Sequence, residues 1–305
     1  MRLSWILGCA WLATSAAMAG EIAQQDQTGS VALQTDTRLS VEEAEKVFRN
    51  SGLNLLSSSA MVVDQKTGRV IYGKNTDARM PIASITKLMT AMVVLDAQLP
   101  LDEKIAIAPA DRDSLKGTHS RIRVGTTMTR QLALQLALMS SENRAAAALG
   151  RAYPGGFSAF VAAMNRKAES LGMSRTRFVD STGLNSDNMS TAQDLVKMVN
   201  AAYTYSLIRE ITTTGFYDVA MRGGSSRLQY KNTNLLVRNK IWEIGLSKTG
   251  FINEAGHCLV MQANIANQPM VIVLLDSWGK LSRIGDAERI KKWMESSKGV
   301  RRHFG

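Results

Sequence analysis

The sequence contains few cysteines, only Cys9 and Cys258 among 305 residues. Cys9 lies in an N-terminal export signal, described below, so we expect only Cys258 to remain in the exported chain, without an internal disulfide. Cys258 stands in the run HCLVMQANI, which is typical of a buried strand. We therefore expect a buried, unreactive thiol.

Histidine is equally scarce, and the three residues His119, His257 and His303 do not have the spacing of zinc ligands. We expect neither a metal site nor a cofactor. His257 and Cys258 are neighbours in a predicted strand, so their side chains face opposite ways and form no nucleophilic pair. The sequence also lacks a G-x-S-x-G stretch, which argues against an α/β-hydrolase.

Long apolar runs are absent after the N-terminus, where no segment has eighteen uninterrupted apolar residues. We therefore expect no transmembrane anchor in the exported chain. Residues 1–19 begin with Arg2, continue with a short apolar run and end in AMA. This pattern predicts a secretory signal peptide that is cleaved after Ala19.

Acidic residues are outnumbered, since 37 Lys and Arg face 26 Asp and Glu and give a net charge of +11. Removal of residues 1–19 takes away Arg2 and no acid, so the exported chain carries +10. Such a charge favours anionic surroundings, for example a membrane surface, nucleic acid or an acidic polymer. Export argues against nucleic acid, while a basic surface without such a partner stays open.

The hydrophobic pattern predicts helices in the middle of the chain and strands towards both ends. Helices are expected over residues 84–98, 129–140, 144–151, 157–171, about 190–203 and about 283–296. Strands are expected over residues 58–64, 69–75, 216–221, 235–239, 241–251, 257–265 and 270–277. This order predicts an α+β domain over residues 57–297, with one antiparallel sheet built from both chain ends, flanked by helices, and a helical subdomain. We expect residues 20–56 to form a flexible leader with a short helix near 40–50, and residues 298–305 to form a tail.

Three short patterns each occur twice, and together they describe a serine acyl-transfer site that uses lysine as its base. They are Ser-x-x-Lys at 84–87 and 277–280, Ser-x-Asn at 141–143 and 186–188, and Lys-Thr-Gly at 66–68 and 248–250. The structural context of each copy must decide which one is functional.

The second Lys-Thr-Gly is the better candidate. Lys66 lies in a predicted hairpin turn, whereas Lys248 lies in a predicted strand that carries Lys248 and Gly250 on one face and Thr249 on the other. Gly250 has no side chain, so it leaves room for another backbone, such as that of a substrate along the strand edge.

The first Ser-x-x-Lys and the first Ser-x-Asn are favoured for similar reasons. Ser84 and Lys87 stand at the start of a predicted helix, where i,i+3 spacing brings side chains together. The copy at 277–280 follows a strand and contains a glycine, which predicts a loop. Ser141 and Asn143 link two apolar helical runs, whereas the copy at 186–188 lies in a segment of ordinary loop composition.

These residue types suit nucleophilic catalysis. Ser84 is a nucleophile only if Lys87 is neutral, and we expect burial, the helix dipole and Lys248 to lower the pKa of Lys87. Ser141 can relay a proton to a leaving amine, and Asn143 can bind a substrate amide.

We expect two further roles for the second Lys-Thr-Gly and the residue after it. Lys248 and Thr249 can bind a carboxylate, provided that the strand turns locally at Thr249. The backbone N–H groups of Ser84 and of Phe251, the residue after Gly250, can form an oxyanion hole.

The runs PIASITKLMTAMVVLD, LMSSENRAAAALG, TRFVDSTGLN and LSKTGFINEAGHCLVM resemble the low-molecular-mass penicillin-binding proteins, over roughly residues 57–297. The resemblance implies a β-lactamase/transpeptidase-like fold and an acyl-enzyme on Ser84 with Lys87 as base. By position in the motifs, the site is completed by Ser141, Asn143, Lys248, Thr249, Gly250 and the N–H of Phe251. β-Lactams would acylate the same serine as covalent inhibitors.

The resemblance also implies a substrate and a location. The substrate is the D-alanyl bond of peptidoglycan, and in the subgroup that the runs most resemble it is the peptide cross-link. The polyanionic wall is then a partner for the positive charge, in the periplasm. The chain lacks the second β-domain and amphipathic tail of related carboxypeptidases, which we interpret as a periplasmic enzyme without an anchor.

Three alternatives stay open. A DD-carboxypeptidase uses the same site on a pentapeptide stem, and a non-catalytic β-lactam sensor would not turn over. A β-lactamase needs a deacylating acid, and Glu169 lies in a predicted helix without a following Leu-Asn. Glu142 stands where the family has aspartate, and we expect its carboxylate to face a neighbouring loop.

Overall fold

The computed structural model describes residues 52–220 and 227–296. The predicted signal peptide, residues 20–51 of the leader with its predicted helix near 40–50, and the tail lie outside the described residues. No helix in these two ranges is both long and apolar enough to cross a bilayer.

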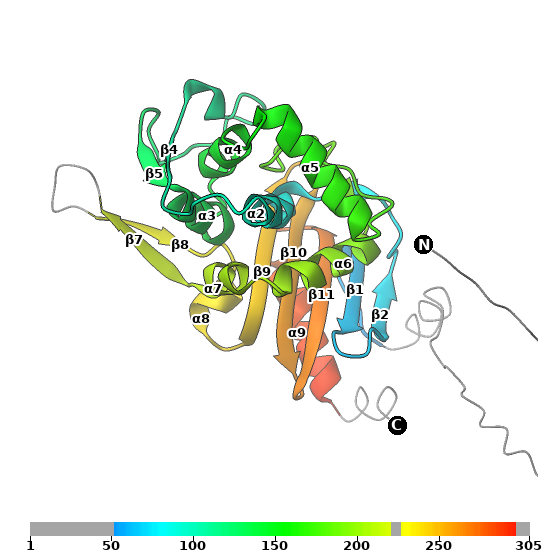
Figure 1. The fold of residues 1–305 in the computed structure, drawn as a ribbon. Coiled ribbons are helices and arrows are strands. Elements are labelled where there is room, and N and C mark those ends of the chain that lie inside the picture. The colour runs from blue at the N-terminus through cyan, green and yellow to red at the C-terminus, as the bar shows by residue number, and fades with distance from the viewer. Residues whose placement is uncertain (1–51, 221–226, 297–305) are drawn as a thin grey trace, which may run out of the picture. The chain divides into compact units, whose positions relative to one another are not determined.

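A five-stranded antiparallel sheet is the centre of the fold, with the strand order β2-β1-β11-β10-β9 (Figure 1). Its strands are β1 Ser57–Asp64, β2 Val70–Lys74, β9 Glu243–Ile252, β10 Gly256–Ile265 and β11 Gln268–Ser277. The two ends of the chain meet where β1 pairs with β11, with Ser57 opposite Ser277. The prediction of an α+β fold with one antiparallel sheet from both chain ends is confirmed.

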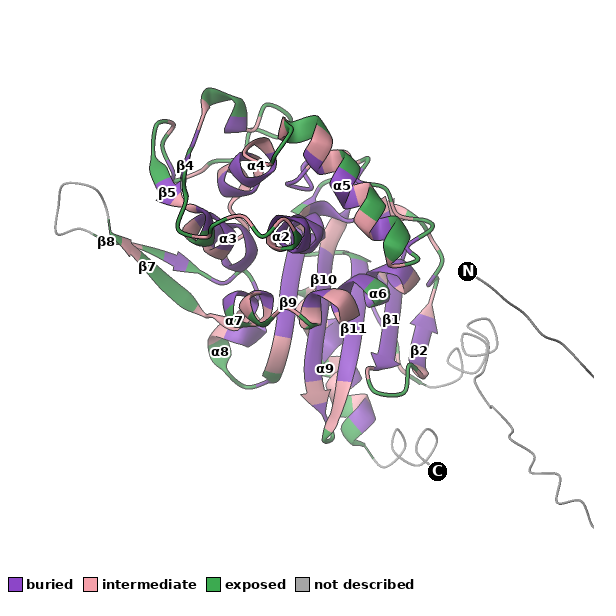
Figure 2. Ribbon diagram, viewed as in Figure 1, coloured by how far each residue is buried: buried purple, intermediate pink, exposed green. Residues whose placement is uncertain are grey.

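Both faces of the sheet are covered, which explains why its strands are almost continuously apolar. Alternate residues of β10 enter different clusters, Val260 on the face towards most of the helices and Leu259 on the opposite face. Both side chains are fully buried. Figure 2 shows the same burial along most of β1, β9, β10 and β11.

Helices cover the two faces unequally. The first face and its helical subdomain carry α2 Thr86–Asp96, α3 Arg130–Met139, α4 Asn143–Arg151, α5 Gly156–Ser170, α6 Ala192–Tyr203 and α7 Ser206–Thr213. The second face carries α9 Ser282–Glu295 (Figure 1). Helix α2 packs against α3, α4, α5 and α6. It is apolar nearly all round, as a helix in the middle of a bundle must be.

Short elements complete the fold. They are the 3₁₀ turns η1 Ala83–Ile85 and η2 Pro109–Asp111, helix α8 Leu235–Asn239, and the strand pairs β3 Met80–Pro81 with β6 Met189–Ser190, β4 Lys104–Ala106 with β5 Thr127–Thr129, and β7 Phe216–Ala220 with β8 Arg227–Lys231. Residues 235–239 were expected to form a strand, and that prediction is wrong. The Asn234 side chain accepts a hydrogen bond from the Leu236 N–H (3.0 Å) and so starts a helix instead. Helix α7 and strand β8 were not predicted.

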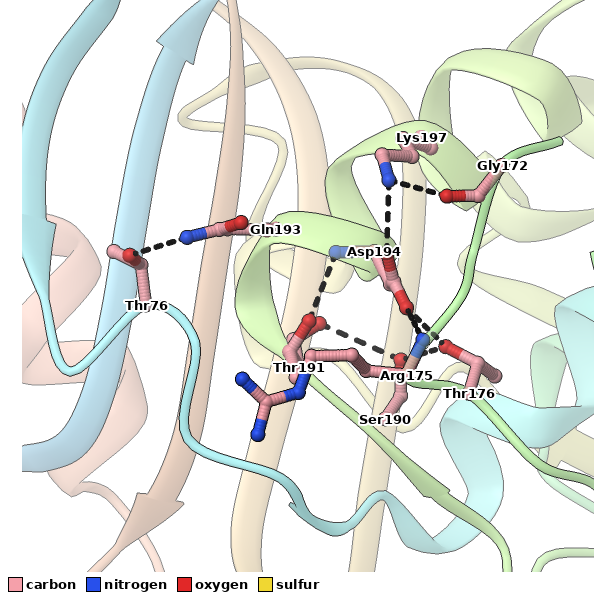
Figure 3. Close-up of polar contacts among 9 residues, drawn as sticks. All are labelled: Thr76, Gly172, Arg175, Thr176, Ser190, Thr191, Gln193, Asp194 and Lys197. Atoms are coloured by element: carbon pink, nitrogen blue, oxygen red, sulfur yellow. Dashed lines mark hydrogen bonds and ion pairs between the residues drawn. The ribbon is translucent and has the colours of Figure 1, made fainter. Parts of the chain in front are cut away.

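The start of α6 is fastened to two other parts of the chain (Figure 3). The Thr191 hydroxyl caps the helix by accepting from the Asp194 N–H (3.1 Å). The buried Asp194 carboxylate accepts from the Arg175 N–H and the Thr176 hydroxyl, each at 2.9 Å. Gln193 donates to Thr76 in the segment that follows β2 (3.1 Å). These bonds hold the turn after α5 and the edge of the sheet against one helix.

A buried carboxylate on α9 joins that helix to the first strand. Asp286 is fully buried and accepts hydrogen bonds from the Leu56 N–H (2.9 Å), the Ser57 N–H (2.8 Å) and the Ser57 hydroxyl (2.6 Å). The Ser57 hydroxyl also lies 2.7 Å from that of Ser277 at the end of β11. One side chain thus satisfies the backbone where the two chain ends meet.

We predict that Asp286→Ala lowers the free energy of unfolding by about 3 kcal/mol, because it leaves the buried Ser57 N–H and the half-buried Leu56 N–H without an acceptor. Urea unfolding followed by circular dichroism measures the change. Glu295→Ala, at an exposed position of the same helix, is the control and should change stability by less than about 0.5 kcal/mol. Equal stabilities of the two variants would contradict this assignment.

Candidate active site

The site lies where η1, at the start of α2, meets the edge strand β9. Two glycines allow this approach. A Cβ on Gly250 would lie 2.9 Å from the Ile82 carbonyl oxygen and 3.1 Å from the Ser84 nitrogen, and one on Gly183 would lie 1.9 Å from the Ala83 oxygen. The Ser84 backbone is therefore held between two positions that accept no side chain.

This contact corrects one expectation. We interpreted Gly250 as leaving room for the backbone of a substrate, but the backbone that lies against its missing side chain is the chain's own 82–84 turn. The expected loop at 277–280 is present, since β11 ends at Ser277 and Gly279 has a φ of 86°.

Ser84 and Lys87 are brought together as their spacing predicts. Lys87 is fully buried, and its Nζ lies 2.8 Å from the Ser84 Oγ, 2.8 Å from the Asn143 Oδ1 and 2.6 Å from the Thr182 carbonyl oxygen. Asn143 is the first residue of α4, and its Nδ2 donates to the Thr118 hydroxyl (3.0 Å). One amine thus contacts three segments of the helical subdomain.

Burial lowers the pKa of Lys87 to about 7, although the carboxylates of Asp180 and Glu142 act in the opposite direction. A neutral amine has two N–H donors and one lone pair. The Asn143 and Thr182 oxygens can only accept, so they take the two donors and leave the lone pair directed at the Ser84 hydroxyl. The three contacts fit the uncharged form of Lys87.

The expected causes of this shift are only partly right. Burial acts on the pKa of Lys87 as predicted, but the helix dipole is not among the causes found. The predicted repulsion between Lys87 and Lys248 is present, and it contributes to the lowered pKa of Lys248. The pKa of Lys248 is held well below the ordinary value by burial first, then by the charges of Lys87 and Arg283.

A second lysine–serine pair lies beside the first. The Lys248 Nζ donates to the Ser141 Oγ (2.9 Å) and to the Thr249 carbonyl (2.8 Å). Ser141 has a φ of 59°, a left-handed conformation that is uncommon for serine and is concentrated at functional sites. The Thr249 hydroxyl donates to the Thr233 hydroxyl (2.6 Å), which ties β9 to the segment before α8.

The other copies of the motifs are structural. Gly68 has a φ of 73° in the turn between β1 and β2, and Lys66 is exposed there. Asn188 is fully buried, and its Oδ1 accepts from the N–H groups of Val179 (2.6 Å) and Asp180 (3.2 Å). Its role is to shape the loop that supplies the Thr182 carbonyl.

Two single residues are also placed. The Glu142 carboxylate accepts from the Arg144 N–H (3.3 Å) and caps its own helix α4. That it faces a neighbouring loop stays a prediction. Cys258 is buried in β10 as expected, and burial raises the pKa of its thiol to about 11.

Sequence reasoning missed several neighbours of the site. Arg283 on α9 places its Nη1 3.3 Å from the Gly250 carbonyl oxygen and 2.9 Å from the His257 Nδ1. Thr118, Thr182 and Thr233 complete the shell described above. None belongs to a motif pattern, and Arg283 lies in α9, a helix that supplies no motif residue.

One family and several relatives match this chain. The family of S11 peptidases described as D-alanyl-D-alanine carboxypeptidase matches residues 45–278. The D-alanyl-D-alanine endopeptidase of Pseudomonas aeruginosa is 52% identical over 242 residues, 79% of this chain and 78% of that protein. The D-alanyl-D-alanine endopeptidase of Escherichia coli is 50% identical over 244 residues, 80% of this chain and 79% of that protein.

Solved structures agree with this assignment. The Streptomyces K15 DD-transpeptidase is 29% identical with a TM-score of 0.72, over 79% of this chain and 97% of that one. Penicillin-binding protein D2 of Listeria monocytogenes, solved in a cefotaxime-bound form, is 30% identical with a TM-score of 0.69, over 79% and 98%. The resemblance to low-molecular-mass penicillin-binding proteins, and within them to penicillin-binding protein 7, is confirmed. The chain belongs to the S11 family of serine peptidases and is a serine DD-peptidase.

Proposed function

We propose that this chain is a D-alanyl-D-alanine endopeptidase, which cleaves the peptide cross-links of peptidoglycan through an acyl-enzyme on Ser84. The observation that carries the proposal is the buried Lys87 amine, whose Nζ lies 2.8 Å from the Ser84 Oγ. The names of the most similar relatives support the endopeptidase over other reactions of the family.

Acylation begins with proton transfer from the Ser84 hydroxyl to the neutral Lys87. The Ser84 oxygen forms a bond with the D-alanyl carbonyl carbon, and negative charge collects on the carbonyl oxygen. The backbone N–H groups of Ser84 and Phe251 stabilise this oxyanion. The close packing of Gly250 against the Ser84 nitrogen supports such a pairing of donors.

Collapse of this intermediate breaks the carbon–nitrogen bond, and the leaving amine needs a proton. Ser141 is placed to deliver one, because its hydroxyl accepts a hydrogen bond from Lys248 and can pass its own proton on. The proton that Lys87 took from Ser84 then replaces the one that Ser141 gave, so Lys87 is neutral again when acylation ends. Asn143 binds a substrate amide next to Lys87. Lys248 and Thr249, with the cation of Arg283 near the Gly250 carbonyl, bind a substrate carboxylate.

Water then attacks the acyl-enzyme ester, and the neutral Lys87 accepts the proton of the water. Lys87 returns this proton to the Ser84 oxygen as the ester bond breaks, which releases Ser84 and a free D-alanyl carboxylate. Glu142 caps α4, and its charge raises the pKa of Lys87, so it acts on this step through the base. The β-lactamase alternative needs a deacylating acid beside the ester. Glu169 lies in α5 and is exposed to solvent, as the predicted helix requires.

The second candidate is a DD-carboxypeptidase that removes the terminal D-alanine of a pentapeptide stem. The description of the matched family favours it, and the chemistry at Ser84 is the same. For either activity we propose that the enzyme acts in the periplasm after export, on the anionic wall and not on nucleic acid. β-Lactams acylate Ser84 in place of the peptide.

The expected products separate the two candidates. Residues 20–305 are incubated with a cross-linked muropeptide dimer and with a monomeric pentapeptide, and products are followed by liquid chromatography and mass spectrometry. We predict conversion of dimer to monomers, complete loss of this activity in Ser84→Ala, and full activity in Ser186→Ala, from the other Ser-x-Asn copy. Release of D-alanine from the pentapeptide alone would establish the carboxypeptidase instead.

The buried amine also predicts how stability depends on pH. The pKa of Lys87 is about 7 in the folded chain against an ordinary 10.5, so between these values the unfolded chain holds one more proton. The stability of the wild type relative to Lys87→Met should therefore rise with pH, by about 1.4 kcal/mol per pH unit in that window. Urea unfolding at several pH values measures this, and the exposed Lys66→Met should show no such dependence. A flat difference for Lys87→Met would mean that the lysine is charged when folded.

A further inference from the structure

A pocket of about 650 Å³ lies outside the site described above. One wall is the segment 121–128, which runs into β5, a second is α3 with Leu132 and Leu136, and the third is the β7–β8 hairpin with Val219, Leu228 and Tyr230. Figure 1 shows this hairpin extending from the sheet alongside α3. The volume lies within the range of sites that bind small ligands.

The walls of the pocket are bonded to the Ser141 side of the active site. The Leu136 carbonyl accepts from the Glu142 N–H (3.0 Å), and the Ile122 carbonyl accepts from the Arg144 guanidinium (2.5 Å). The hairpin continues from Tyr230 into Thr233, whose hydroxyl accepts from Thr249. Burial raises the pKa of the Tyr230 hydroxyl, and the charge of Glu142 adds to this effect, in agreement with a position of Tyr230 near the Ser-x-Asn loop.

This is the side on which the amine product leaves in the proposed mechanism. Ser141 delivers the proton to the leaving nitrogen and accepts a hydrogen bond from Lys248. The rest of the leaving peptide, beyond that nitrogen, therefore extends past Ser141 and Lys248. A carboxypeptidase must accommodate only a single amino acid there. An endopeptidase must accommodate a second stem peptide, which requires a pocket of larger volume.

The lining of the pocket suits an anionic peptide. Its floor is aliphatic, and its rim carries Arg121 and Arg123 without any acidic residue. Arg121 donates to the Gln229 carbonyl (2.8 Å) and lies 4.0 Å over the Tyr230 ring. Within residues 52–220 and 227–296, neither arginine forms an ion pair with a carboxylate. Arg123 is exposed and free to pair with a carboxylate of a ligand.

We propose that this pocket is the subsite for the leaving stem peptide of the cross-link, with Arg123 binding a carboxylate of that peptide and the aliphatic floor packing against its side chains. The inference rests on the proposed endopeptidase function. It assigns the difference between cleaving a cross-link and removing a single D-alanine to two segments outside the motifs. They are the segment 121–128 and the β7–β8 hairpin, whose last pocket residue, Tyr230, lies 18 residues before Lys248.

Two variants of the full exported chain test the subsite by different means. Arg123→Glu reverses the charge on the rim, and Val219→Trp fills the pocket. For each, kcat/KM is measured on a cross-linked muropeptide dimer, and the rate of acylation by a fluorescent penicillin reports on Ser84 alone. Arg166→Glu, an exposed change of the same charge on α5, is the matched control.

We expect both pocket variants to lose about tenfold or more in kcat/KM on the dimer, because a charge-assisted hydrogen bond or the bound stem itself is lost. Acylation by penicillin should be unchanged, since a penicillin has no leaving peptide, and Arg123→Lys should retain most of the dimer activity. Undiminished dimer cleavage in both variants overturns the subsite. A parallel loss of penicillin acylation overturns it too, because the damage then lies at the catalytic serine.

The wild type separates this inference from the function on which it rests. If it leaves the dimer intact and trims the pentapeptide, the proposed endopeptidase is wrong and the subsite falls with it. If the wild type cleaves the dimer and both variants do so equally well, the proposed function stands and only the subsite is wrong.

Discussion

An uncharged amine, buried against a serine hydroxyl, is the interaction on which the rest of this site depends. Helix α2 packs against four other helices, and Lys87 on it is fully buried, so its ammonium form is disfavoured. Two nearby carboxylates, Asp180 and Glu142, oppose this effect and keep the pKa of Lys87 from falling further than about 7. The balance places the pKa of the base near neutral pH, where a general base is most effective.

The second requirement is a close approach between the helical subdomain and the sheet. Ser84, Lys87, Ser141 and Asn143 come from helix starts, whereas the Lys-Thr-Gly segment belongs to the edge strand β9. Gly183 and Gly250 let these two parts meet at the Ser84 backbone, which lies within van der Waals distance of both. Strand β9 pairs with β10 on one side, and the 82–84 turn approaches it at Gly250.

Much of this arrangement follows from the sequence, because the strands and α2 are long apolar segments and the motif spacings match the elements that carry them. The strand predicted over residues 235–239 is a helix in the structure. A short apolar run fits either element, and the cap at Asn234 favours the helix. The carboxylate of Glu142, the Thr182 carbonyl and Arg283 reach the site through tertiary contacts between distant segments. No local pattern encodes such contacts, so sequence reasoning found the motif residues and missed the groups that set their charge.

The rate at which a β-lactam acylates the enzyme, measured from pH 5 to pH 10, tests the central claim most directly. Acylation of the free enzyme requires the neutral form of its base, so the rate constant should rise with pH, with its midpoint near 7, and then level off. The wild type serves as its own reference because the β-lactam has no leaving peptide to complicate the result. A rate constant that continues to rise towards pH 10 would show that Lys87 keeps the ordinary lysine pKa, and it would contradict the account of a neutral buried base.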